Sequence, residues 1–324
     1  MPAPADILSP ADLAALAARQ PMPEEFGPDS PRPLIAFALA DADPALGPWL
    51  AHLPCPVIGI GAGPLDLACD VVLDDADQLG PIARNVAAAP IAAMVLVQHL
   101  RASAGLPLES ALTAESFAYA TLQQGPEFKR LSFPRIERKP ANQPAPVEIS
   151  YTGTGMGLRL NRPATLNAID AEMRDALCEA LDIALLDPDA PAVRLTAAGR
   201  AFSTGGEVAE FGLAADPATA HWVRSLRLPA RRIARLADRL SVHVHGAAIG
   251  AGLEIAAFAR HLTATPDAWF QLPELKYGLI PGAGGTASLP RRIGRQRTAY
   301  LALSMRRLSA AAARDWGLVD AIVE

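Results

Sequence analysis

The sequence predicts a protein of the α/β class. Short apolar segments closed by turn residues, which are typical of buried strands, alternate with longer segments in which apolar residues recur at helical spacing. Hydrophobic residues make up 51% of the 324 residues, so the chain can bury a sizeable core. This length suits one large domain or two ordinary ones.

Composition and charge argue against several kinds of partner. The net charge of -5 leaves no basic footprint for a nucleic acid. Cys55, Cys69 and Cys178 have no metal-binding spacing, and so few cysteines indicate a reduced chain. No apolar run approaches the ~20 residues of a membrane helix, and no signal-peptide pattern opens the sequence. We therefore expect a cytoplasmic protein that binds neither nucleic acid nor a membrane.

The first 140 residues are predicted to form a part with its own strands and helices. Ser9 is the expected N-cap of a short helix that has Pro10 in its first turn. The turn-bounded apolar runs predict strands at 33–39, 55–63 and 70–75. Helical periodicity then predicts helices over 78–88, 91–104 and 108–124.

Residues 134–149 mix charge and proline without periodicity, which predicts a linker. After it the alternation of strands and helices begins again. Asp170 is the expected N-cap of a helix that ends near Leu186. Strands are predicted at 156–163, 190–198, 240–246 and 261–265, with further helices up to about Arg239.

Three motifs suggest other functions but are better explained as structure. The run "GIGAGP" (59–64) has Pro64 where a dinucleotide-binding loop needs its third glycine, so we interpret it as a turn that ends a strand. His243 and His245 share one strand face, but no third metal ligand has suitable spacing, so we interpret them as structural. Ser203 lacks the G-x-S-x-G elbow of a serine hydrolase.

Three other segments carry residues suited to one kind of chemistry. They are "GRAFSTGGEVAEF" (199–211), "HGAAIGAGLEIAAFA" (245–259) and "FQLPELKYGLIPGAGGTASLPR" (270–291). Taken singly, each is a loop that leads into a helix, and Glu254 or Glu274 could be an ordinary helix-start carboxylate. Together, the glycine turns offer backbone amides for a developing oxyanion, and the two carboxylates offer an acid and a base. The combination predicts enolate chemistry.

These segments resemble the crotonase (enoyl-CoA hydratase/isomerase) superfamily. The resemblance runs from about residue 147 to the end of the sequence, through "LNRPATLNAID", "AFSTGGEVAEF", "GAAIGAGLEIAAFA", "FQLPELKYGLIPGAGGTASLPRRIG" and "ARDWGLVDAIV" in that order. It implies crotonase-like repeated ββα units with associated helices. It also implies acyl-coenzyme A thioesters as substrates and assembly as a homotrimer or a dimer of trimers.

Carried across by position, the resemblance assigns an oxyanion hole to the amides of Gly206 and Ala251, which would bind the substrate. Glu254 would position and activate water for attack at C3, and Glu274 would exchange the proton at C2. The residues that would border coenzyme A are Ala164, Leu166, Glu207 and Val208. No metal and no separate cofactor are implied, because coenzyme A arrives as part of the substrate.

The sequence departs from the family pattern at three places. Glu207 stands where aspartate is common, and His245 where asparagine is common. The sequence also stops after "GLVDAIV", where the family continues with helices, and residues 77–131 resemble those helices. We therefore expect residues 1–140 to be a degenerate crotonase-like part that supplies the missing helices to a catalytic core at 141–324. Its removal is expected to expose apolar surface.

The expected activity is that of an enoyl-CoA hydratase-like enzyme, by syn hydration or dehydration, because both glutamates are present. An isomerase or a hydratase-lyase of a specialised acyl-CoA is the alternative, since these share the oxyanion hole. A non-catalytic acyl-CoA-binding scaffold is the alternative from another class, and two carboxylates beside an oxyanion hole argue against it. Residues 217–239 are expected to shape the acyl pocket.

Overall fold

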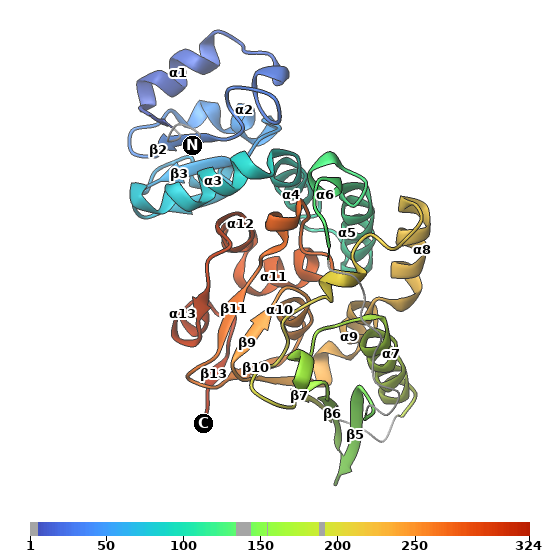
Figure 1. Cartoon of the computed structure of the whole chain (residues 1–324). Coiled ribbons are helices and arrows are strands. Elements are labelled where there is room, and N and C mark those ends of the chain that lie inside the picture. The colour runs from blue at the N-terminus through green and yellow to red at the C-terminus, as the bar shows by residue number, and fades with distance from the viewer. Residues whose placement is uncertain (1–5, 134–143, 154, 188–191) are drawn as a thin grey trace.

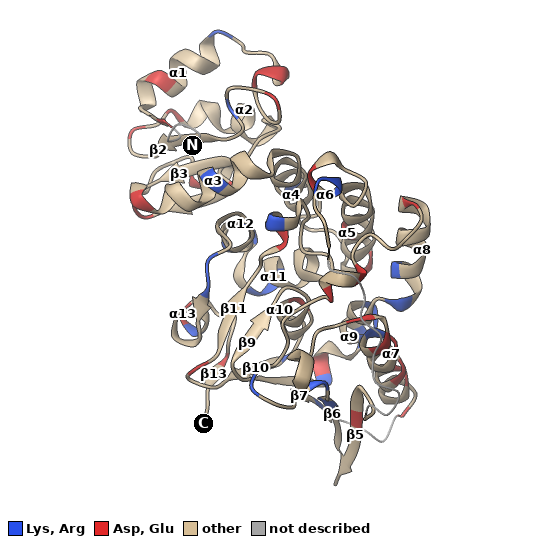
Figure 2. Cartoon of the chain, viewed as in Figure 1, with Lys and Arg blue, Asp and Glu red and all other residues tan. Residues whose placement is uncertain are grey.

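The computed structural model describes residues 6–133, 144–153, 155–187 and 192–324 (Figure 1). Most of the predicted linker at 134–149 lies outside these ranges. Among the described helices, none is by itself long and apolar enough to cross a membrane. One pair of helical segments, 76–88 and 90–102, would be long and apolar enough together, but it is bent by 110°. Acidic and basic residues are interspersed along the chain (Figure 2).

A sheet of four parallel strands occupies the N-terminal part of the chain. The strands neighbour one another in chain order: β1 (Ile7–Leu8), β2 (Ile35–Ala38), β3 (Val57–Ile60) and β4 (Val71–Leu73). Ile35 and Phe37 face a core shared with α1 (Pro10–Ala18) and α2 (Gly47–His52). Ala36, between them, faces the core on the other side, where α3 (Leu79–Ala88) lies. The sheet is therefore covered by helices on both faces, as its apolar strands require.

A six-stranded sheet organises the second half of the chain. Its order is β13-β10-β8-β7-β6-β5, parallel except for the β5–β6 hairpin. The strands are β5 (Val147–Thr152), β6 (Gly155–Leu160), β7 (Ala192–Ala197), β8 (Leu240–Val244), β10 (His261–Ala264) and β13 (Ala321–Ile322). A small sheet of β9 (Ala247–Ile249), β11 (Trp269–Gln271) and β12 (Leu308–Ser309) accompanies it.

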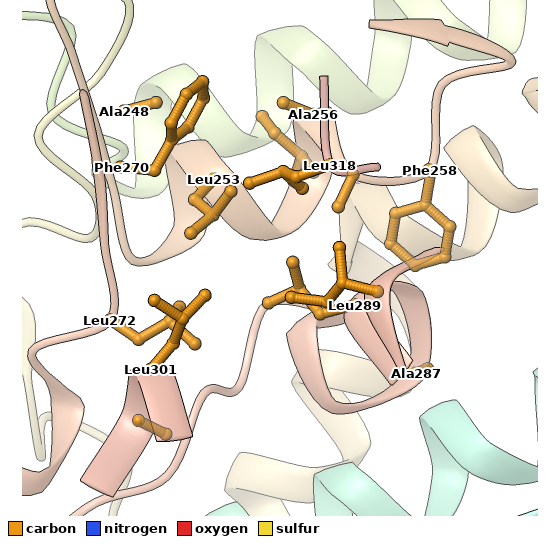
Figure 3. Close-up of a cluster of buried hydrophobic side chains, with 14 of the residues drawn as sticks. Ala248, Leu253, Ala256, Phe258, Phe270, Leu272, Ala287, Leu289, Leu301 and Leu318 are labelled. Atoms are coloured by element: carbon orange, nitrogen blue, oxygen red, sulfur yellow. The ribbon is translucent and has the colours of Figure 1, made fainter. Parts of the chain in front are cut away.

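Helices cover these sheets and connect the two halves. They are α4 (Pro90–Ala102), α5 (Leu108–Leu122), α6 (Pro126–Lys129), α7 (Ala171–Leu186), α8 (Pro217–Arg227), α9 (Pro229–Leu236), α10 (Ala251–Ala256), α11 (Gly285–Ile293), α12 (Arg295–Ser304) and α13 (Ala310–Asp315). Leu253 of α10, Leu289 of α11 and Leu301 of α12 meet in one buried cluster with Phe270 (Figure 3). This packing fixes α10 and α11, the two helices that carry the candidate site.

The helices α3, α4 and α5 lie against the second half of the chain. The Asn85 side chain donates to the carbonyl oxygens of Leu303 (2.9 Å) and Ser304 (3.0 Å) at the end of α12. A second contact joins α5 to the C-terminal half: Arg231 of α9 forms an ion pair of 2.7 Å with Glu109 of α5. One continuous hydrophobic core therefore joins these helices to the C-terminal half. Whether they replace the helices with which crotonases end stays a prediction.

Most of the predicted elements are confirmed. Ser9 and Asp170 cap α1 and α7 through their side chains, and "GIGAGP" is a turn in which Gly61 has a φ of +82°. The sequence analysis missed the edge strand β5, the short strands β1 and β13, and the small sheet. β5 has an exposed apolar face, and the other missed strands are only two or three residues long, too short for an alternating pattern to show.

Candidate active site

Glu254 lies in the first turn of α10, and its side chain is 2% exposed. Its Oε2 accepts hydrogen bonds from the amides of Ala283 (2.6 Å) and Gly285 (2.7 Å) at the start of α11. A Cβ atom on Gly285 would lie 2.5 Å from Glu254 Cγ, so this close approach requires glycine. No donor among the described residues reaches Oε1. One oxygen of Glu254 is therefore held by the protein, and the other is left for a ligand.

Glu274 begins the short 3₁₀ helix η8 (Glu274–Tyr277), directly after Pro273. Its Oε2 is buried and has no hydrogen-bond partner among the described residues. A Cβ atom on Gly250 would lie 2.5 Å from Glu274 Oε1, and the φ of Gly250 is +48°. Gly250 directly precedes α10, and its carbonyl accepts from the Glu254 amide (2.9 Å). The Glu274 carboxyl, which lies against Gly250, therefore lies against the turn that opens α10. The two predicted glutamates are thus brought to the same place.

Burial makes both carboxyl groups unusually weak acids. It raises the pKa of Glu254 to about 8, the charge of Glu115 adds to this, and the amides of Gly285 and Ala283 oppose it. Burial also raises the pKa of Glu274 well above its ordinary value, and the charge of Glu254 adds to this. A carboxyl group that titrates near neutral pH, as Glu254 does, is suited to proton transfer. Two carboxyl groups that repel each other lose their protons in separate steps.

Two unpartnered backbone amides lie beside these carboxylates. Ser203 bridges to Ala248 of β9, which brings the loop after β7 against the turn before α10. A Cβ atom on Gly205 would lie 2.8 Å from the Ile249 carbonyl oxygen and 3.5 Å from the Ala251 amide nitrogen. Within the described ranges, neither the Gly206 amide nor the Ala251 amide has an acceptor. Two such amides can together bind an oxygen that acquires negative charge.

The segment around Ala164 and Leu166 runs beside the same loop. Ile169 donates to the Gly205 carbonyl (2.7 Å), and Thr204 donates to the Leu166 carbonyl (3.1 Å). The structure therefore brings the predicted coenzyme A-bordering residues together. Ala164 lies in the 3₁₀ turn η5 (Pro163–Thr165), followed by Leu166, and Glu207 and Val208 follow Gly206 directly.

Glu207 and Leu166 each have a local structural role. The Glu207 carboxylate accepts from the Ala209 amide (3.0 Å), which caps the next turn. Leu166 adopts a left-handed φ of +55°, and the φ of Asn167 is similar. The buried Asn167 side chain donates to the carbonyls of Ala198 (2.8 Å) and Ala201 (2.9 Å), and these bonds hold the turn.

The sequence analysis missed Glu115, which is fully buried in α5. Its carboxylate accepts from the amides of Gly284 (2.8 Å) and Thr286 (2.9 Å) and from the Thr286 hydroxyl (2.7 Å). The signal that could have found it is the one that singled out Glu254: a lone acid in an apolar stretch, here "SALTAESFAYA". Its partners lie 169 and 171 residues away, so spacing could not reveal them.

Tyr119 and Arg224 complete the buried cluster. The Arg224 guanidinium lies 4.5 Å from the centre of the Tyr119 ring, and its Nη2 lies 3.6 Å from Glu115 Oε1. It also donates to the Gly282 carbonyl. Burial raises the pKa of the Tyr119 phenol, and the charge of Arg224 opposes this. The charges of Glu254 and Glu274 raise it further, so the phenol shares their surroundings.

Other candidate chemistries find no arrangement to support them among the described residues. His243 contacts the Thr263 hydroxyl (3.0 Å), and His245 contacts the Gly199 carbonyl (2.8 Å), so each has a structural partner. The Ser203 hydroxyl donates to the Asn167 carbonyl (2.8 Å). In the ranges that the structure describes, no group of three or more His, Cys, Asp or Glu side chains could hold a metal ion.

Comparison with known proteins gives this arrangement a family. The family model described as enoyl-CoA hydratase/isomerase matches residues 154–324. The 1,2-epoxyphenylacetyl-CoA isomerase of Escherichia coli is 36% identical over 52% of this chain and 66% of the relative. The mitochondrial enoyl-CoA hydratase of Pongo abelii is 33% identical over 51% of this chain and 56% of the relative. In both matches, this chain spans less than two thirds of the relative's length.

Solved structures agree with the sequence relatives. The enoyl-CoA hydratase from Thermoplasma volcanium superposes with a TM-score of 0.50 at 35% identity, covering 56% of this chain and 72% of that one. An enoyl-CoA hydratase/isomerase from Mycobacterium paratuberculosis gives a TM-score of 0.51 at 28% identity, covering 56% and 74%. The α/β fold is therefore crotonase-like, as the sequence predicts. The matched family model spans more than half of the chain, and the protein belongs to the enoyl-CoA hydratase/isomerase family.

Proposed function

We propose that the protein is an enoyl-CoA hydratase-like enzyme that adds water to a 2-enoyl-CoA thioester in the syn sense, or removes it. One observation carries the proposal. Two buried carboxyl groups, each with an oxygen that no described donor reaches, lie beside two unpartnered backbone amides. A binding module does not need buried carboxyl groups with raised pKa values and a free oxygen, whereas proton transfer does.

The first role belongs to the amides. In the proposed mechanism the Gly206 and Ala251 N–H groups form the oxyanion hole, donating to the thioester oxygen. Negative charge develops on this oxygen as water attacks C3. The surroundings are apolar, with Leu253 of α10 in one buried cluster with Phe270, so the two hydrogen bonds stabilise that charge more than they would in water.

The carboxyl groups then move the protons. Glu254 is held through Oε2, so its Oε1 is the oxygen proposed to bind water and take its proton as the C3–O bond forms. Glu274, protonated, delivers its proton to C2 as the enolate collapses. The product gains one OH and one H, and a proton must pass from Glu254 to Glu274 before the next turnover. Their raised pKa values suit a pair that exchanges one proton.

The remaining features of the proposal rest on the family resemblance and, for the cytoplasmic location, on the composition of the chain. Ala164, Leu166, Glu207 and Val208 are proposed to border coenzyme A, which is part of the substrate, so no separate cofactor is needed. A homotrimer or dimer of trimers in the cytoplasm is the proposed working form. Residues 217–239, which form α8 and α9, are proposed to shape the acyl pocket.

A second candidate activity is isomerisation of a specialised acyl-CoA. The E. coli relative, at 36% identity, is a 1,2-epoxyphenylacetyl-CoA isomerase, and an oxyanion hole serves both reactions. The presence of both glutamates favours hydration, since water attack and C2 protonation each need a partner.

The test is a panel of 2-enoyl-CoA thioesters of increasing chain length, followed by the loss of the conjugated thioester absorbance. We expect turnover of at least one member, with a 3-hydroxyacyl-CoA as product. Turnover of 1,2-epoxyphenylacetyl-CoA, assayed separately because it is not a 2-enoyl thioester, without turnover of any panel member would favour the isomerase. Tight acyl-CoA binding without turnover of any thioester would overturn the proposal in favour of a scaffold.

A further inference from the structure

Four consecutive backbone amides at the start of α11 are divided between two carboxylates. The Ala283 and Gly285 amides donate to Glu254. The Gly284 and Thr286 amides donate to Glu115. Segment 283–286 is thus held from two sides, by α10 and by α5, and neither carboxylate can move without disturbing the bonds of the other.

The two carboxylates use their oxygens differently. Both bonds to Glu254 reach Oε2. Glu115 accepts at Oε1 from Gly284 and at Oε2 from the amide and hydroxyl of Thr286, and its side chain is fully buried. Both oxygens of Glu115 therefore already accept hydrogen bonds from the protein. Its surroundings suit a residue that holds others in place.

We propose that Glu115 is a positioning residue for the reaction. Through Gly284 and Thr286 it fixes the segment that orients Glu254, and its negative charge acts on the Glu254 carboxyl. The inference rests on the proposed function, since it concerns the proton transfer assigned to Glu254. It adds a residue from the N-terminal part of the chain to the working site.

The charged and titratable groups around Glu254 all come from packed elements. They are Glu115 and Tyr119 on α5, Arg224 on α8 and Glu274 on η8. Burial raises the pKa of Glu115 as well, whereas Arg224, the Thr286 hydroxyl and the amides of Gly284 and Thr286 favour its ionised form. After burial, ionised Glu115 is the largest influence that raises the pKa of Glu254, and Arg224 acts in the opposite direction. Removing the charge of Glu115 should therefore lower the pKa of Glu254.

Two substitutions separate the effect of the Glu115 charge from the effect of its side-chain length. Glu115→Gln keeps the length of the side chain and removes the charge, although its NH₂ group must face one backbone donor. Glu115→Asp keeps the charge but shortens the side chain by one methylene, which lengthens the hydrogen bonds from Gly284 and Thr286. Glu109→Gln is the matched control, because Glu109 lies on the same helix and its carboxylate pairs with Arg231 instead.

The first measurement is the pH dependence of kcat/KM and kcat for a 2-enoyl-CoA. Because ionised Glu254 is the proposed base, activity rises with pH through its pKa. For Glu115→Gln we expect the acidic limb to move down by about one pH unit and kcat to fall about tenfold, with KM little changed. For Glu115→Asp we expect a fall in kcat without that movement. Glu109→Gln should match the wild type.

An outcome in which neither Glu115 variant differs from Glu109→Gln would overturn the proposal. So would an equal loss of kcat in both variants with unmoved limbs, because this is what a purely structural role predicts. Circular dichroism and thermal unfolding check the fold of each variant. Should Glu115→Gln fail to fold, Thr286→Val removes the hydroxyl that donates to Glu115 and that also contacts His99 Nε2 (2.8 Å). An unchanged kcat in Thr286→Val would overturn the proposal.

The second measurement needs no turnover. Carbon-13 NMR of protein labelled at the Glu side-chain carboxyls reports the pKa of Glu254, whose signal is assigned by its loss in Glu254→Gln. We expect this pKa to fall in Glu115→Gln and to stay in Glu109→Gln. If the wild type turns over no thioester, the proposed function fails. The titration still decides whether Glu115 acts on Glu254, so the two failures remain distinguishable.

Discussion

Two buried acidic side chains of this molecule, Asp70 in the N-terminal part and Glu274 in the candidate site, have opposite surroundings. Asp70, beside β4, accepts from Arg101, from Arg295 (2.9 Å) and from the Val57 amide (2.9 Å). The carboxyl of Glu274 is also buried, but its Oε2 has no partner in the described part of the chain. A fully partnered buried charge is a structural joint, here between the N-terminal sheet, α4 and α12. An unpartnered one is the mark of a site.

The energetic reason is the cost of removing a carboxylate from water. Asp70 recovers that cost through two guanidinium groups and a backbone amide. Glu254 and Glu274 recover little of it, so burial favours their protonated forms and raises their pKa values. The same desolvation therefore accompanies a stable joint in one region and a reactive pair in the other.

The largest effect expected from this contrast is on catalysis. Glu254→Gln and Glu274→Gln should each lower kcat by about 10²- to 10⁴-fold, because each removes a proton-transfer group. In Glu254→Gln the new amide can keep both bonds from α11 by turning its carbonyl oxygen toward Ala283 and Gly285. Both variants should therefore fold and retain acyl-CoA binding, measured by calorimetry. Full activity in either would remove that residue from the mechanism.

At the joint, the expected effect is on stability. Asp70→Asn leaves two guanidinium groups without their counter-charge, and should cost about 3 kcal/mol of unfolding free energy, measured by urea denaturation. The active site is not touched, so kcat/KM should stay near the wild-type value. Asp66→Asn, at an exposed position in the preceding turn, is the control. Equal stability of the two variants would contradict the assignment of Asp70 as a joint.

A third prediction concerns the glycine that Glu274 lies against. In Gly250→Ala the added Cβ would meet Glu274 Oε1, so the carboxyl must move. A displacement of this size should lower kcat by about 10²-fold. Gly61→Ala is the control: its φ of +82° is also positive and strains alanine, but nothing lies within 4 Å of the added atom. It should lose about 1 kcal/mol of stability and no activity. A similar kcat loss in both would point to backbone strain instead.

A fourth prediction concerns the pH dependence of stability. The pKa of Glu254 is about 8 in the folded protein, above the value of an exposed carboxyl, so the folded state holds the proton more tightly. Its contribution is present below about pH 4.5 and is lost as the pH rises through about 8. We expect wild type to lose stability relative to Glu254→Gln between about pH 4.5 and 8, a window that follows from those pKa values. Parallel urea-unfolding curves for the two proteins would contradict this.

Local sequence patterns predicted much of the fold. The strands at 35–38, 57–60 and 71–73 are short, apolar and closed by turn residues, and Ser9 and Asp170 are recognisable caps. The small sheet was not predictable. Ala247–Ile249 and Trp269–Gln271 become strands because they pair with each other across 22 residues of chain, not because of their own pattern.

The candidate site likewise combines residues that belong to local motifs with one whose role depends on distant contacts. Glu254 and Glu274 could be named because each belongs to a local motif with a family resemblance. Glu115 stands out in the sequence only as a lone acid in an apolar stretch, and its role arises where α5 meets α11. The roles assigned to Gly206, Ala251 and the coenzyme A-bordering residues stay predictions, as does the relation of residues 77–131 to the C-terminal helices of crotonases.

The bonds that Glu115 makes to Gly284 and Thr286 close loops of 169 and 171 residues. Contacts so distant along the chain form late in folding, because the entropy of closing a loop grows with its length. The strands β2, β3 and β4, by contrast, pair with their nearest neighbours in the chain. Enzymatic activity should therefore return more slowly on refolding than the helical circular dichroism signal, and simultaneous recovery would argue against this order. A chain with most of its secondary structure formed would still be inactive.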